Sequence, residues 1–281
     1  MPYLSIRSVQ IYHEVYGDSG PWLALNSGGR HRYLEMAPLA RMIAAEGFRV
    51  LVHDRRNTGA SDIVIAGDDS EEEIWADDLH ALMDHYGATT AYFGGSSAGA
   101  RLSMMMQRRH PESVLGLLLM RVTGGDFAAG RLPRIYYGQF IEAAKQGGMA
   151  AVCATEAYSE RLTLNPSSRE RLMSMDPQNY IRVMQSWLDT FLSGPMKPVM
   201  GIPEAELQGY RLPVLVVPGN DKTHSSANGR TAASLIPSSE LSELPLEDQD
   251  VDIIPFPEWK DQYPALTRKF VDFMRHHSAR H

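Results

Sequence analysis

Short apolar runs and amphipathic helical segments alternate along the first part of the chain. Residues 4–16 alternate apolar and polar side chains in two short stretches, which predicts an antiparallel hairpin at a sheet edge. Apolar runs without such alternation follow at residues 22–25, 48–52, 89–93 and 114–122. Segments with apolar residues at helical spacing separate these runs, at residues 35–46, 71–86 and 98–109. The pattern predicts an α/β fold, with a mostly parallel twisted sheet and helices on both faces.

This alternation stops after residue 123 and resumes at residue 207. The intervening segment contains no convincing strand and is rich in methionine and aromatic residues. We therefore predict a core formed by residues 1–123 and 207–281, with a helical insertion at 124–206. In the second part of the core, the pattern predicts strands at 213–217 and 240–246 and helices at 231–236 and 263–276. In the insertion, Tyr137 and Trp187 are candidates for an adaptable apolar pocket lining, although ordinary helix packing is the simpler reading.

A serine flanked by glycines lies between the strand predicted at 89–93 and the helix predicted at 98–109. The segment Gly95-Ser96-Ser97-Ala98-Gly99 fits the pattern G-x-S-x-G of a nucleophile elbow. In such a strained turn, side chains two residues before and after the serine would collide, and glycine removes both collisions. The Ser97 hydroxyl would then point away from the sheet, and the Ala98 N–H would donate to a developing oxyanion. Ser96 fits a looser form of the pattern, but Ser97 fits it better.

These motifs resemble the α/β-hydrolase superfamily, and the resemblance extends over nearly the whole chain in order. Asn26-Ser27-Gly28-Gly29 stands where the family has its oxyanion loop, and residues 54–61 resemble the family turn D-x-R-G-x-G-x-S, with Asn57 replacing a glycine. Residues 218–224 resemble the loop of the catalytic acid, with Asp221 in its place, and the insertion at 124–206 matches the helical cap. The resemblance implies a serine–acid–histidine triad and an oxyanion hole formed by backbone N–H groups of Ala98 and of Gly28 or Gly29.

The histidine of this triad is missing from its usual place. In the family it follows the last strand, but residues 246–264 contain no histidine. Three replacements are open: His224, three residues after Asp221; His31, beside the oxyanion loop; and Glu258, where the family spacing points. A carboxylate is a poorer base near neutral pH than an imidazole unless burial raises its pKa. The plainer alternatives are a loop-bracing His224, an exposed His31 and a solvated Glu258.

Because the catalytic base is not settled by the sequence, three functions are possible. The first is cofactor-independent hydrolysis of a small carbonyl substrate (an ester, thioester, lactone or C–C bond) through Ser97 and a histidine oriented by Asp221. The second is a lyase, isomerase or cyclase, in which Ser97 polarises a carbonyl and a histidine or Glu258 moves the proton. The third is a small-molecule receptor that has lost catalysis. The intact elbow argues against the receptor, because its backbone strain has no use in a binding protein.

Three arginines near the predicted site are candidates for holding a substrate. Arg30 and Arg32 follow the oxyanion loop, and Arg121 ends the strand after the nucleophile helix. These positions lie at the sheet edge where ligands of open α/β sheets bind. Guanidinium groups there would hold a carboxylate or phosphate by bidentate contacts, with a surface position as the alternative for Arg30 and Arg32.

Composition and charge exclude several other partners. The chain has 281 residues, with 27 Lys and Arg against 34 Asp and Glu, and its net charge of −7 argues against broad nucleic-acid binding. It has one cysteine, no calcium-loop spacing and no nucleotide-binding glycine motif, so we expect no metal and no cofactor. Without a long apolar run or a leader pattern, we expect no membrane span and a cytoplasmic location. A homodimer is the expected oligomer, if there is one, because closed dimers are the commonest.

Overall fold

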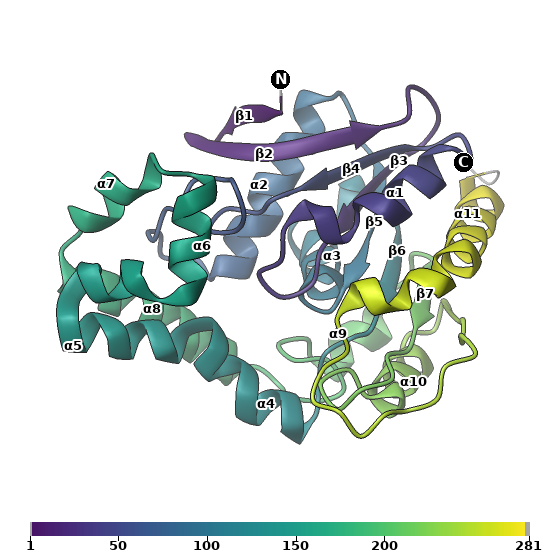
Figure 1. Ribbon diagram of the computed structural model, residues 1–281. Helices are drawn as coiled ribbons and strands as arrows, with labels where there is room; N and C mark the ends of the chain where they lie inside the picture. Colours follow the sequence, from purple (N-terminus) through teal and green to yellow (C-terminus); the bar gives the residue numbers. More distant parts are fainter. Residues whose placement is uncertain (1, 279–281) are drawn as a thin grey trace.

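A mixed sheet of eight strands forms the centre of the fold (Figure 1). The computed structural model describes residues 2–278. In spatial order the strands are β1 (Tyr3–Ile6), β2 (Val9–Tyr16), β4 (Arg49–His53), β3 (Trp22–Asn26), β5 (Ala91–Ser96), β6 (Val114–Met120), β7 (Val214–Val217) and β8 (Ser239–Leu241). β2 pairs antiparallel with β1 and β4, and the remaining pairs are parallel. The predicted edge hairpin and mostly parallel sheet are therefore confirmed.

Helices cover both faces of this sheet. On one face lie α1 (Ala37–Ala44) and α11 (Tyr263–Ser278). On the other lie α2 (Glu71–His85), α3 (Ala98–Arg109), α9 (Glu204–Gly209) and α10 (Ser226–Leu235). In β3, Ala24 joins the core of the second face, whereas its neighbours Leu23 and Leu25 join the core of the first. Burial on both sides explains why these strands are apolar at consecutive positions.

The segment between β6 and β7 folds into helices with a core of their own. They are α4 (Asp126–Pro133), a π-helical turn (Arg134–Gly138), α5 (Gln139–Ala154), α6 (Glu156–Leu164), α7 (Ser168–Met173) and α8 (Pro177–Ser193). Figure 1 shows α5 to α8 gathered beside the sheet, with α4 leading to them. Within the described part of this segment, extended pairing is limited to one isolated bridge, between Val199 and Ile202. The helices therefore occupy the region predicted as an insertion, while its division from the core as a separate domain stays a prediction.

Two predicted elements differ from the structure in length. The strand predicted at 240–246 is confined to β8, because its only strand partner in the described sheet, β7, ends at Val217 and leaves the following residues nothing to pair with. The helix predicted at 231–236 is α10, which begins at Ser226; its first turn is polar and shows no apolar period. A Cβ on Gly229 would lie 2.9 Å from Pro218 Cα, so this glycine lets α10 pack against the loop that follows β7.

No helix within residues 2–278 is long and apolar enough to cross a membrane.

Candidate active site

Ser97 occupies a strained turn at the carboxyl end of the central strand β5. The strand ends at Ser96 and α3 begins at Ala98, and Ser97 between them has φ +59° and ψ −116°. Positive φ is uncommon for a residue other than glycine and concentrates at functional sites. The strand–turn–helix context predicted for Ser97 is present.

The two glycines of the elbow are required by the end of strand β3. A Cβ on Gly95 would lie 2.4 Å from the carbonyl oxygen of Asn26, and one on Gly99 would lie 2.2 Å from the same atom. Any larger residue would push β3 and its oxyanion loop away from Ser97. The glycine spacing therefore keeps the oxyanion loop in contact with the nucleophile turn.

The loop after β7 brings a histidine and an acid to Ser97. Ser97 Oγ lies 2.9 Å from His224 Nε2, and His224 Nδ1 lies 2.9 Å and 3.0 Å from the two carboxylate oxygens of Asp221. The backbone N–H of His224 also donates to Asp221 Oδ1, at 2.8 Å, so the loop closes on itself. Ser97 Oγ has a second neighbour, Thr123 Oγ1, at 3.0 Å. The acid and the imidazole thus come from one turn, with the spacing Asp-x-x-His.

Asp221 is held as a carboxylate by His224 and by two further contacts. Burial alone would raise its pKa, but the hydrogen bond and charge of His224, the Ile254 N–H at 3.0 Å and the Arg121 guanidinium at 2.8 Å outweigh burial. Together they hold the pKa of Asp221 well below its ordinary value. Ile254 lies in the segment where the family histidine is absent. That segment therefore contributes a backbone N–H to the acid instead of an imidazole to the serine.

His224 is buried, and its surroundings lower its pKa. Burial lowers its pKa, the Asp221 hydrogen bond partly offsets this, and the positive charge of Arg121 lowers the pKa further. Arg121 NH2 lies 3.2 Å from His224 Nδ1 and also donates to the Ile254 carbonyl. Arg121, predicted to contact substrate, is therefore buried and engaged by the acid–histidine pair.

Replacing Arg121 with methionine should move the acid limb of the kcat/KM profile to higher pH. In the wild type the pKa of His224 lies below the ordinary histidine value of about 6.5, so the imidazole stays neutral to a lower pH. Methionine removes the nearby positive charge, so the imidazole gains a proton more easily. The measurement is kcat/KM against pH with a neutral ester for both proteins. An acid limb that stays in place, or moves to lower pH, would contradict a role of His224 as base.

Two of the three predicted oxyanion donors are free, one at the start of α3 and one in the oxyanion loop. Within residues 2–278, the backbone N–H groups of Ala98 and Gly29 have no acceptor. The N–H of Gly28 donates to Glu35 Oε2 at 2.6 Å, so this predicted donor is occupied. Arg55 braces the loop from behind, donating to the carbonyl oxygens of Gly29 at 2.6 Å and Gly28 at 3.2 Å. The geometry thus favours Ala98 and Gly29 as the oxyanion donors.

Two adjoining cavities open onto these groups. A cavity of about 50 Å³ is lined by Ser97, His224, Arg121 and the oxyanion loop. A larger one, of about 650 Å³, lies under α4, α5 and α6 and shares part of its lining with the small cavity. The shared residues are Gly29, His31, Glu35, Leu132, Tyr136, Ile253 and Pro255. The larger cavity therefore adjoins the space around the serine.

The other two candidate bases do not bond Ser97. The His31 side chain is 62% exposed and lies 3.9 Å from Glu35, although it lines both cavities. Glu258 is exposed on the 3₁₀ helix Phe256–Gln262 and lines neither cavity. Of the three predicted replacements, the structure brings His224 to the serine.

Most of the other predicted substrate contacts are engaged elsewhere. Arg30 forms a bidentate ion pair with Glu71, at 2.8 Å and 2.5 Å, although it still lines the larger cavity. Arg32 lines the same cavity, with its Nε 3.8 Å from Asp54. Tyr137 donates to Glu71 and Trp187 donates to the Asp69 carbonyl, and both line a separate cavity of about 430 Å³. Tyr137 and Trp187 therefore belong mainly to the core of the helical segment.

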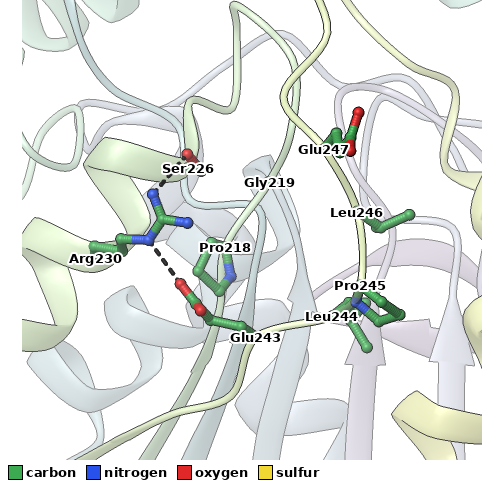
Figure 2. Close-up of a pocket in the computed structure, with 9 residues that line it drawn as sticks. All are labelled: Pro218, Gly219, Ser226, Arg230, Glu243, Leu244, Pro245, Leu246 and Glu247. Carbon is green, nitrogen blue, oxygen red and sulfur yellow. Dashed lines mark hydrogen bonds and ion pairs between the residues drawn. The ribbon is translucent and has the colours of Figure 1, made fainter.

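Two further features lie apart from Ser97. Figure 2 shows Arg230 bridging Ser226 and Glu243 beside a cavity of about 360 Å³.

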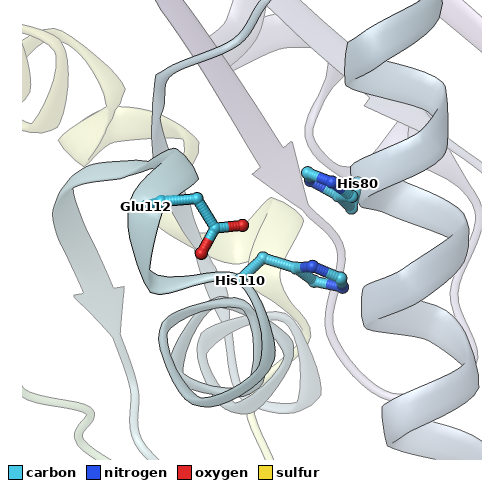
Figure 3. Close-up of side chains that lie close together, drawn as sticks. All are labelled: His80, His110 and Glu112. Atoms are coloured by element: carbon cyan, nitrogen blue, oxygen red, sulfur yellow. The ribbon is translucent and has the colours of Figure 1, made fainter.

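Figure 3 shows His80, His110 and Glu112, which gather at the end of α3 farthest from Ser97. The two imidazole rings stack at 4.0 Å and 9°, so their nitrogen lone pairs run parallel and do not converge on one ion. This cluster has the geometry of a hydrogen-bonded surface group rather than of a metal site.

Comparisons with known proteins agree with this architecture. Residues 23–244 match the family described as the alpha/beta hydrolase fold, so the chain belongs to that family and the predicted membership is confirmed. An uncharacterized hydrolase, YraK, from Bacillus subtilis is 31% identical over 111 residues, and a proline iminopeptidase from Lactobacillus helveticus is 30% identical over 129. These matches span 40% and 42% of this chain and 40% and 41% of those relatives.

Solved structures share the fold over almost the whole chain. An enol-lactonase from Burkholderia xenovorans aligns with a TM-score of 0.65 and 21% identity, over 98% of this chain and 100% of its own. A thermophilic esterase from Thermogutta terrifontis aligns with a TM-score of 0.66 and 18% identity, over 98% of each chain. At these identities the likeness establishes the fold, and the chemistry has to be argued from the site.

Proposed function

We propose that this protein is a serine hydrolase that cleaves a small ester or lactone through an acyl-enzyme on Ser97. The observation that carries the proposal is the continuous chain of contacts from Ser97 Oγ to His224 Nε2 and from His224 Nδ1 to Asp221. The nucleophile is within hydrogen-bond reach of the base, and the base is within reach of the orienting acid. This is the geometry that activates a serine. Thioester and C–C bond cleavage would use the same groups.

The reaction would proceed in two halves. Ser97 Oγ attacks the substrate carbonyl carbon while His224 Nε2 takes the hydroxyl proton, and the N–H groups of Ala98 and Gly29 stabilise the resulting oxyanion. As the tetrahedral intermediate collapses, His224 returns the proton to the leaving alcohol. Water then attacks the acyl-Ser97 ester, with His224 again taking and returning a proton, and releases the acid. Asp221 holds the imidazole in the required tautomer and stabilises the imidazolium.

The compact Asp-x-x-His turn supports this assignment in place of the missing family histidine. Both ends of the Asp221 carboxylate are fixed, one by the His224 N–H and ring and the other by Ile254 N–H and Arg121. A fixed acid fixes the ring, and a fixed ring keeps Nε2 aimed at Ser97. These fixed contacts keep the acid and the base in place relative to each other, which favours His224 as the base.

Mixing the enzyme with excess p-nitrophenyl acetate tests this proposal. If deacylation is slower than acylation, nitrophenolate should appear in a burst of about one equivalent per enzyme, followed by steady turnover. Mass spectrometry of the quenched burst should find the acetyl group on Ser97. A burst of nitrophenolate with no acetyl group on Ser97 in the acid-quenched protein would contradict the covalent mechanism. No turnover across esters and lactones would contradict the hydrolase itself.

A further inference from the structure

We propose that Arg161 binds a carboxylate, so that the preferred substrate is an ester whose acyl chain ends in a carboxylate. This substrate class rests on the proposed hydrolase function, whereas carboxylate binding itself does not. The site would lie in the larger cavity, outside the small cavity around Ser97. A monoester of a small dicarboxylic acid would then place its scissile carbonyl at Ser97 and its free carboxylate at Arg161.

Arg161 is a buried charge that the protein leaves without a partner. Its side chain belongs to α6, and the residue is 6% exposed. Within residues 2–278 its guanidinium makes no hydrogen bond or ion pair; it lies over the rings of Tyr158, at 5.0 Å, and Phe140, at 5.9 Å. The other buried arginines have acceptors: Arg56, Arg101 and Arg121 bond carboxylates, and Arg55 bonds backbone carbonyls. An unpaired buried charge is costly, and a ligand anion removes that cost.

The face of α6 that carries Arg161 lines the larger cavity. Ala157, Arg161 and Leu164 all belong to this lining, and their spacing of four and three residues puts them on one side of the helix. Nε and NH1 of Arg101 are fully buried and unpaired, whereas no nitrogen of the Arg161 guanidinium is. Because the Arg161 nitrogens have no partner in the described chain, they must retain some accessible surface. Arg161 therefore offers donors to the cavity, and its planar fork suits bidentate binding of a carboxylate.

The rest of the cavity fits an anion on an apolar body. Arginines 30, 32, 131 and 161 line it against Glu35 and Glu160, so positive charge predominates. Arg30 is already neutralised by Glu71 and Arg32 lies 3.8 Å from Asp54, whereas the buried Arg161 has an unpaired charge among the described residues. The same lining also includes apolar side chains, among them Leu132, Ile135 and Phe140. A volume of about 650 Å³ accommodates a small organic acid or its ester.

The test compares two esters of equal acyl length. Wild type, Arg161→Met and a control, Arg169→Met, would be assayed with mono-p-nitrophenyl adipate and with p-nitrophenyl hexanoate. Arg169 is an exposed arginine of the neighbouring helix α7. Wild type and control should prefer the adipate ester in kcat/KM. Arg161→Met should lose about 10- to 100-fold with the adipate ester, mainly through KM, and little with the hexanoate.

The same variants should be titrated with adipate by calorimetry, which needs no turnover. Adipate should bind to wild type and control and lose about 10-fold or more in affinity for a folded Arg161→Met protein. If no ester is hydrolysed but adipate binding depends on Arg161, the hydrolase proposal fails and the carboxylate site stands. If wild type shows no preference for the adipate ester, or if Arg161→Met affects both esters equally while remaining folded, the carboxylate site is wrong.

Discussion

Replacing His224 with alanine should lower kcat by at least about 1,000-fold, without unfolding the protein. His224 Nε2 is 2.9 Å from Ser97 Oγ, and no other imidazole in the described chain bonds this hydroxyl. Without it the serine hydroxyl keeps its proton at neutral pH and is a poor nucleophile. The measurement is steady-state hydrolysis of p-nitrophenyl acetate at neutral pH, with thermal unfolding to confirm the fold.

His31→Ala is the matched control for this prediction. His31 lines the same cavities but is 62% exposed and makes no hydrogen bond to Ser97, so its loss should change kcat by less than about tenfold. Asp221→Asn should fall between the two histidine variants, because it spoils the tautomer of His224 and leaves the ring in place. A His31→Ala protein that is as impaired as His224→Ala would show that the base comes from the oxyanion loop.

Replacing Ser97 with alanine should lower kcat by about 10³- to 10⁶-fold, as expected for removal of a covalent nucleophile. Alanine in the strained turn keeps the Cβ and removes only Oγ, so the fold and the cavity should persist. The measurement is single-turnover hydrolysis at high enzyme concentration, which excludes an effect on product release.

The double variant Ser97→Ala/His224→Ala provides the control for a shared mechanism. Residues that act as one unit are strongly non-additive, so the double variant should be about as slow as either single variant. Losses that multiply would indicate that the two groups act in separate steps. Retention of more than about a tenth of the wild-type rate by Ser97→Ala would assign the nucleophile to another group.

The elbow could be predicted from sequence because its constraints are local. Gly95, Ser97 and Gly99 lie within one turn and form a recognisable pattern. The Asn26 carbonyl that demands both glycines ends β3, and only the structure shows that β3 pairs with β5. The mostly parallel sheet followed equally from the two-sided apolar strands. The length of its last strand was overestimated, because the neighbouring strand β7 ends at Val217 and leaves the residues after Leu241 without a strand partner.

From the sequence alone, the residue that acts as base toward Ser97 could be limited to three candidates but not chosen among them. Whether His31, His224 or Glu258 reaches Ser97 depends on the paths of three separate loops, which no local pattern describes. The spacing of three residues between Asp221 and His224 was the available signal, since a tight turn allows such neighbours to pair. The substrate contacts were harder still, because Arg30 meets Glu71 across 41 residues of sequence.

The sequence analysis did not single out Arg161, because the proposal for it rests on the absence of a hydrogen-bond acceptor in the fold, which no sequence pattern reveals. Its helix is polar on several sides, and sequence alone does not tell which face meets the cavity. For Tyr137 and Trp187 the sequence left pocket lining and helix packing open, because aromatic residues suit both. The structure places them in the core of the helical segment, where they also line the cavity of about 430 Å³.

The most direct test of the proposed triad is labelling with a fluorophosphonate, followed by mass spectrometry of the modified peptide. A single adduct on Ser97 is expected in the wild type, none in Ser97→Ala, and labelling slower by about 1,000-fold or more in His224→Ala. An adduct on another residue, or unchanged labelling in His224→Ala, would contradict the Ser97–His224–Asp221 assignment.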